Sequence, residues 1–170
     1  MYAQSKAPFA PRSTAGRYGY RPAPIRARIG LAMRRAMNFG AMPDAESVLR
    51  GQGLSLAPMS VGDAGLNVGG TSVLPTAEAA DIESGALKAL VVPAGAADPE
   101  AAAALDDVIV RASAKGMPVF AFGEGVAATL KALGQDAGPW VDAPAVMVTG
   151  VTVEAVADLE ALGAAARRIE

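Results

Sequence analysis

The residues best placed for chemistry lie in the turn Gly123-Glu124-Gly125, between an apolar run, Met117–Phe122, and a helical segment, Val126–Leu133. Glu124 is the one ionisable group in this turn. A carboxylate at this position interacts favourably with the positive end of the helix dipole and stabilises the helix by about 0.3–1 kcal/mol. As a general acid or base it would need a partner or a metal. The pattern therefore favours a structural role for Glu124 and indicates no catalytic residue.

The composition excludes most other enzyme chemistry. The 170-residue chain has no cysteine and no histidine, so it has no thiolate nucleophile, no disulfide, no Ser-His-Asp triad and no imidazole metal ligand. Ser60 and Thr71 have no base to activate them, and no set of carboxylates has metal-ligand spacing. We expect neither a metal nor a cofactor.

One motif predicts a different class of protein. Gly123-x-Gly125-x-x-Ala128 follows a strand and opens a helix, which fits the dinucleotide fingerprint, and Asp142 lies 19 positions after Gly123. In the fingerprint that acid ends the next strand, whereas Asp142 precedes the predicted strand Ala145–Thr149. The fingerprint also belongs to the first βαβ unit. Nucleotide binding is therefore the minor alternative.

Apolar runs alternate with helical segments along the chain from residue 26. The predicted strands are Ile29–Met33, Leu54–Val61, Ala89–Val92, Met117–Phe122 and Ala145–Thr149. The predicted helices are Ala45–Arg50, residues 76–86, a helix capped by Asp98 and stopped by Gly116, Val126–Leu133, and Thr152–Ile169. Residues 62–75 are rich in glycine and predict a turn or a small hairpin.

This alternation predicts an α/β fold: a doubly wound, mostly parallel sheet with helices on both faces, of the flavodoxin-like kind. Its core should contain Val91, Val92, Val108, Ile109, Val119, Phe120 and Val146. In such sheets ligands bind at the carboxyl ends of the strands. The loops there follow Met33, span Pro93–Asp98, and form the Gly123–Gly125 turn. No apolar run approaches the roughly 18 residues of a membrane span, and we expect a cytoplasmic protein without membrane contact.

The first 25 residues differ from the rest and are predicted to form an extended arm, with one domain over residues 26–170. Residues 1–35 carry eight basic and no acidic side chains, whereas residues 51–170 carry six basic and fifteen acidic ones. The arm is a free terminus, a cleaved targeting segment, or a strap that docks on a partner protein or a second copy. Nucleic-acid contact is disfavoured because the acidic body would repel phosphates. The candidate docking residues are Phe9, Arg12, Arg17, Tyr18, Tyr20 and Arg21.

The segment Ala89–Gly134 carries a family resemblance. A strand running into Pro-Ala-Gly-Ala, a capped helix, Gly-Met-Pro-Val-Phe-Ala-Phe and a tight turn into a helix resemble the PfpI-like branch of the class I glutamine amidotransferase-like superfamily. The resemblance extends over about residues 26–169. It implies that a nucleophilic cysteine would stand where this chain has Gly123, and that the family's glutamate would fall near Ala41. The nucleophile-less C-terminal domain of large-subunit catalases is the most similar branch.

The resemblance and the missing residue types together predict a pseudoenzyme. Gly95, Gly123, Glu124 and Gly125 would line a vestigial elbow pocket. We expect a catalytically silent accessory, scaffolding or oligomerisation subunit whose basic arm docks on a partner or a neighbouring protomer. The alternative is a residual deglycase or chaperone-type protein, or a small-ligand (nucleotide) binding protein that uses the Gly123-Glu124-Gly125 elbow.

Overall fold

The computed structural model describes residues 24–62, 66–68, 70–96 and 98–170. The predicted docking residues of the arm lie outside these ranges: Phe9, Arg12, Arg17, Tyr18, Tyr20 and Arg21. Among the described residues, no helix has both the length and the apolar character needed to cross a membrane.

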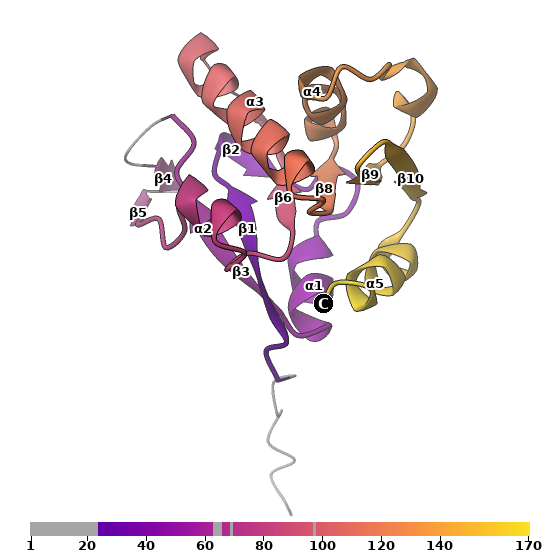
Figure 1. Ribbon diagram of the computed structural model, residues 1–170, viewed down its shortest axis with the longest axis horizontal. Helices are drawn as coiled ribbons and strands as arrows, with labels where there is room; N and C mark the ends of the chain where they lie inside the picture. Colours follow the sequence, from indigo (N-terminus) through magenta and orange to yellow (C-terminus); the bar gives the residue numbers. More distant parts are fainter. Residues whose placement is uncertain (1–23, 63–65, 69, 97) are drawn as a thin grey trace, which may run out of the picture.

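A six-stranded sheet forms the centre of the domain (Figure 1). Its strands, in spatial order, are β10 (Thr152–Val156), β9 (Ala145–Thr149), β8 (Val119–Phe122), β6 (Leu90–Val92), β1 (Ala27–Ala32) and β3 (Leu54–Met59). The four strands from β8 to β3 run parallel. β9 runs antiparallel to both β8 and β10. The sheet is therefore mostly parallel, as predicted.

Helices cover both faces, which confirms the doubly wound architecture. They are α1 (Ala45–Gly51), α2 (Ala79–Glu83), α3 (Pro99–Ala114), α4 (Glu124–Ala132) and α5 (Leu159–Arg167), with a 3₁₀ turn, η1, at Gly138–Trp140. Buried residues of α1 and α5 pack on one face, and those of α2, α3 and α4 pack on the other. α3 begins as predicted, since the Asp98 carboxylate accepts a hydrogen bond of 2.8 Å from the Ala101 amide.

The seven predicted core residues are all buried, but they belong to two cores rather than one. Val91 and Phe120 face α1 and α5, whereas Val92 and Ile109 lie in the core under α2, α3 and α4. Val108, Val119 and Val146 share that second core. The division follows from the alternation of side chains along each strand, which sends neighbours to opposite faces.

The predicted helix Thr152–Ile169 is wrong over its first third. Residues 152–156 form β10, and α5 begins only at Leu159. Asp158 caps the start of α5, since its carboxylate accepts a hydrogen bond of 2.8 Å from the Ala161 amide. Val151, Thr152 and Val153 are β-branched, which favours a strand. The turn between β9 and β10 has Gly150 at φ +60°, and so short a turn makes the two strands antiparallel.

Two small sheets complete the fold. The hairpin predicted within residues 62–75 is present as β4 (Leu66–Val68) and β5 (Thr71–Val73). The second sheet joins β2 (Arg35–Asn38) to β7 (Ala94–Ala96), antiparallel, where the sequence predicts only loops. This pair ties the segment after β1 to the segment after β6 at the carboxyl edge of the main sheet.

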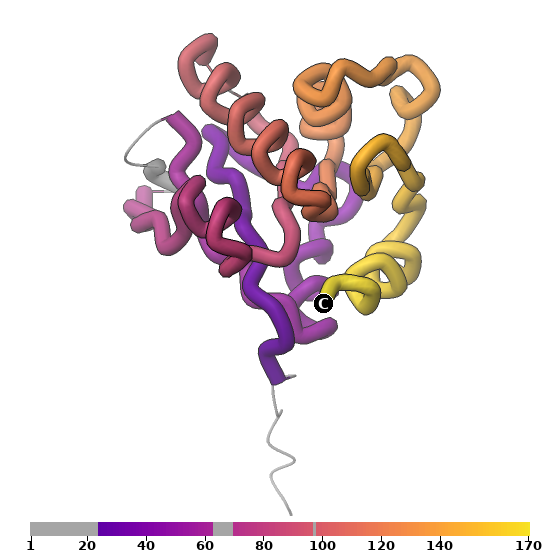
Figure 2. The backbone as a smooth tube through the Cα atoms, viewed as in Figure 1, coloured from indigo at the N-terminus to yellow at the C-terminus, as the bar shows by residue number. Residues whose placement is uncertain are grey.

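The described chain starts at the opposite edge. The guanidinium of Arg26 donates to the carbonyls of Gln52, Ala166 and Ile169, at 2.8, 3.3 and 2.9 Å. This contact joins the start of β1 to the end of α5, and Figure 2 shows the C-terminus close to it. Ile25, just before, is 74% exposed. The described chain therefore begins at the amino edge of the sheet, away from the β8–α4 turn.

Candidate functional site at the carboxyl edge

The turn from β8 into α4 is a sharp elbow centred on Gly123. Gly123 has φ +52° and ψ −124° and precedes the first residue of α4. Its N–H donates to the Pro144 carbonyl at 3.1 Å, which anchors the elbow to the residue before β9. Glycine adopts such a backbone with little penalty, whereas other residues are strained there. The elbow predicted from the sequence is therefore present.

Two backbone segments close over the elbow. A Cβ built on Gly123 would lie 3.1 Å from the Cβ of Ala94 and 3.7 Å from the Cα of Gly40. Gly40 itself has φ +58°, and a Cβ there would lie 3.4 Å from the Cα of Gly123. A Cβ at position 123 would thus make a tight contact with the start of β7 and an ordinary van der Waals contact with the loop after β2.

That loop also contains Ala41, the position at which the family resemblance places a glutamate. Ala41 is exposed and carries no acid. The preceding residue, Gly40, lies against Gly123, so the loop does reach the elbow. Neither Ala41 nor Gly123 supplies a reactive side chain.

Gly125 is buried for a packing reason. A Cβ on Gly125 would lie 2.6 Å from the Val92 carbonyl oxygen and 2.8 Å from that of Pro93. α4 therefore packs directly on the end of β6, and only glycine fits. Asp142, the acid of the dinucleotide fingerprint, is exposed and lies in the segment before β9. Helix–strand packing accounts for the fingerprint glycine without a nucleotide.

Gly95 lies in β7, at the junction with β2. A Cβ on Gly95 would lie 2.8 Å from the Cβ of Arg34 and 2.9 Å from the Arg35 carbonyl oxygen. The glycine thus lets the two small strands approach. The structure brings this segment next to the elbow through Ala94, so Gly95, Gly123 and Gly125 lie in one region of the carboxyl edge.

Glu124 is exposed in the first turn of α4. Burial lowers the pKa of the Arg34 guanidinium, and the negative charge of Glu124 offsets part of that effect. The described residues contain no group of three or more acidic side chains that could hold a metal ion.

Arg34 is the site residue that the sequence analysis missed. It directly follows Met33 at the end of β1, and its Nη1 donates to the Pro93 carbonyl at 3.0 Å, across to the end of β6. The sequence analysis counted it only toward the basic charge of residues 1–35. A pair of arginines immediately after a buried parallel strand was the signal that could have found it, because such strand ends carry ligand sites.

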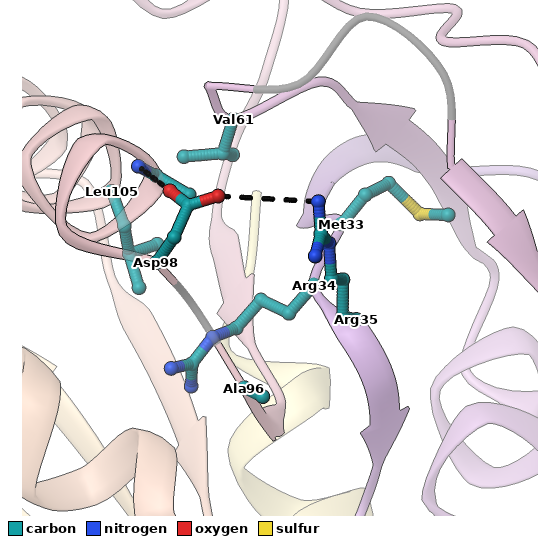
Figure 3. A pocket seen from close by; sticks show the side chains of 8 residues that line it. Met33, Arg34, Arg35, Val61, Ala96, Asp98 and Leu105 are labelled. Atoms are coloured by element: carbon teal, nitrogen blue, oxygen red, sulfur yellow. Dashed lines mark hydrogen bonds and ion pairs between the residues drawn. The ribbon is translucent and has the colours of Figure 1, made fainter.

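A small cavity lies beside Arg34 (Figure 3). Its volume is about 20 Å³, enough for about one water molecule. The Arg35 guanidinium forms an ion pair with the Asp98 carboxylate, with nitrogen and oxygen 4.0 Å apart, and both residues line this cavity. The lining residues are Met33, Arg34, Arg35, Val61, Ala96, Asp98, Ala101 and Leu105.

A larger hollow of about 240 Å³ lies on the other side of the elbow, between α4 and η1. Glu124 and Trp140 lie on its wall, together with Val141, which is 77% exposed. Apolar side chains dominate this hollow, so it offers surface for contact rather than groups for catalysis.

Comparison with known proteins supports the fold and no more. No protein-family model matches the chain, and no curated protein matches it. Among solved structures, Drosophila melanogaster DJ-1beta is similar with a TM-score of 0.52 and 12% identity, over 82% of this chain and 86% of that one. The domain therefore shares the α/β fold of DJ-1beta, which confirms the predicted fold.

A second solved structure matches only in part. An AraC family transcriptional regulator from Pseudomonas putida is 22% identical with a TM-score of 0.41. That match covers 55% of this chain and 54% of the regulator, so the chain spans about half the regulator's length.

Proposed function

We propose that this chain is a catalytically silent domain of PfpI-like fold that serves as an accessory, scaffolding or oligomerisation subunit. In this proposal the basic N-terminal arm docks on a partner protein or on a neighbouring protomer. The C-terminal domain of large-subunit catalases is the branch that it most resembles.

The observation that carries the proposal is the state of the elbow. Gly123 keeps the sharp turn, while Ala94 and Gly40 lie against it. The whole chain has no cysteine or histidine to replace the missing nucleophile. Backbone N–H groups near Gly95 could stabilise an oxyanion, but they cannot start a reaction without a nucleophile. In this proposal the elbow therefore serves packing rather than catalysis.

The charge distribution supports an assembly role. The arm of residues 1–25 carries four basic and no acidic side chains, whereas residues 51–170 hold fifteen acidic and six basic ones. An extended segment of about 25 residues spans roughly 3.1 Å per residue, so it can reach a neighbouring molecule. Because the chain leaves the domain at Pro24, beside the end of α5, the docking surface should start at the amino edge of the sheet.

Turnover assays test the catalytic half of this proposal. Purified full-length protein should show deglycase, glyoxalase and amidase rates equal to buffer. Glu124→Gln is the matched variant, since Glu124 is the acid of the elbow and is exposed. Robust turnover that disappears in Glu124→Gln would contradict the pseudoenzyme proposal.

A further inference from the structure

Arg34 has hydrogen-bond donors that the protein does not use. Its Nη1 donates to the Pro93 carbonyl at 3.0 Å. Its Nε is shielded from solvent and has no acceptor in the part of the chain that the structure describes. Its Nη2 has no acceptor among the described residues either, but unlike Nε this atom is not shielded from solvent. Nε–H and Nη2 lie on the same edge of the planar guanidinium, the edge that binds a carboxylate with two parallel hydrogen bonds.

Within the described part of the chain, no carboxylate forms a direct ion pair with Arg34. Asp98 pairs with Arg35 at 4.0 Å and also caps α3 by accepting from the Ala101 amide. Glu124 acts on Arg34 only at longer range, because no ion pair within 4 Å joins these two described residues. Figure 3 shows the Arg34 guanidinium directed away from the Arg35–Asp98 pair.

The position of Arg34 in the fold is one that favours ligands. From β1 the chain crosses to β3 on one side and then to β6 on the other. The crevice between the carboxyl ends of β1 and β6 is therefore the point where the strand order reverses, the usual ligand site of open α/β sheets. Arg34 follows β1 and donates to Pro93 at the end of β6, so its side chain spans this crevice.

An unpaired donor that is shielded from solvent is costly even on a half-buried side chain, and an acceptor of matching shape would remove that cost. We propose that the Nε–Nη2 edge of Arg34 binds the carboxylate of a small monoanionic ligand at the β1–β6 crevice. One guanidinium without an ion-pair partner, with Glu124 nearby, balances a single negative charge better than two. This binding site goes beyond the assembly role and does not rest on it.

The test uses the ¹⁵N-labelled full-length protein and acetate as the probe, at constant ionic strength maintained with chloride. The Arg34 Nε–H resonance is assigned by its disappearance in Arg34→Lys, which keeps the charge and removes the planar fork. Acetate should move this resonance downfield and saturably. Arg34→Lys should weaken acetate binding roughly tenfold or more, as loss of a bidentate charged pair does. Arg50→Lys is the matched control, because Arg50 pairs with Glu46 on the exposed face of α1.

Glu124→Gln provides a test that misfolding cannot imitate. Removing the opposing carboxylate should tighten acetate binding several-fold, whereas a damaged site would bind more weakly. An Arg34 Nε–H resonance that acetate does not move overturns the proposal. Unchanged acetate affinity in Glu124→Gln also overturns it, and so does tighter binding of inorganic phosphate than of acetate. None of these results depends on turnover or assembly, so they are separate from the fate of the proposed function.

Discussion

The rings of Phe39 and Phe122 stand edge to face, with centroids 5.1 Å apart and planes at 88°. Phe122 is the last residue of β8, directly before Gly123, and Phe39 directly precedes Gly40. The aromatic pair therefore holds the loop after β2 against the elbow, where Gly40 lies against Gly123. The position of Gly40 against Gly123 therefore depends on the packing of the two aromatic rings that precede these glycines.

Replacing Phe39 should weaken the packing of the loop after β2 against the elbow. Phe39→Leu keeps an apolar side chain but removes the aromatic pair, and should lower the free energy of unfolding by about 0.5–1.5 kcal/mol. Urea denaturation measures the loss. Val110→Ala is the control, because Val110 is 47% exposed on α3 and should change stability by no more than about 0.5 kcal/mol. Equal effects of the two substitutions would contradict the role assigned to the ring pair.

A side chain at the elbow should be destabilising for two separable reasons. Gly123→Ala places a Cβ at φ +52° and 3.1 Å from the Ala94 Cβ, and the backbone strain alone should cost about 1–3 kcal/mol. Ala94→Gly in the same chain should recover the part due to the contact. A double-mutant cycle in urea separates the two parts. If the two substitutions are strictly additive, Ala94 does not restrict position 123.

The core under α3 should be sensitive to lost volume. Ile109 is completely buried between α3 and the sheet. Ile109→Ala should lower the free energy of unfolding by about 2–5 kcal/mol, as large-to-small core substitutions do. Chemical denaturation monitored by Trp140 fluorescence and circular dichroism checks this. A loss below that range would mean that the core repacks around the cavity.

Much of this fold follows from local sequence patterns, whereas the site depends on contacts between distant segments. The buried parallel strands are apolar runs, and the start of α3 is signalled by Asp98 and Pro99. The sequence analysis missed β10 because alanine and acidic residues, which are common in helices, occur on both sides of Asp158. The β-branched residues at the start of β10 favour a strand instead. No local signal places Arg34 against Pro93, since 59 positions separate them. The elbow was predictable because its glycines lie together in the sequence.

The contact between β10 and α5 should titrate in acid. Glu154 accepts hydrogen bonds from Arg168, and this hydrogen bond is the main cause that holds the pKa of Glu154 below its ordinary value. The stabilisation is therefore present above the pH at which a free glutamate ionises, and it is lost as the pH falls through the lowered pKa. Because the pair is exposed, its effect on stability should be small.

NMR titration of the Glu154 carboxyl carbon measures this pKa directly. In Arg168→Gln the pKa of Glu154 should rise toward its ordinary value, and high salt should bring about part of the same rise. Arg111→Gln is the matched control, because it breaks the Arg111–Asp107 pair on α3 and leaves β10 unchanged. A Glu154 pKa that responds equally to both substitutions would show that the Arg168 hydrogen bond does not set it.

The arm carries the assembly role proposed for this protein, and its deletion is the decisive test. The aromatic residues Phe9, Tyr18 and Tyr20 would be costly to leave exposed together, and the arginines around them are attracted to an acidic surface. Removing residues 1–25 should therefore reduce the assembled mass measured by light scattering. The charged part of the interaction should weaken in high salt, whereas the aromatic part should persist.

The matched variant keeps the arm but replaces those three aromatic residues by serine, and it should reproduce most of the deletion's effect at high salt. Unchanged mass and unchanged partner binding in the deletion would contradict the docking role, because an arm that contributes neither burial nor charge to an interface cannot hold one together.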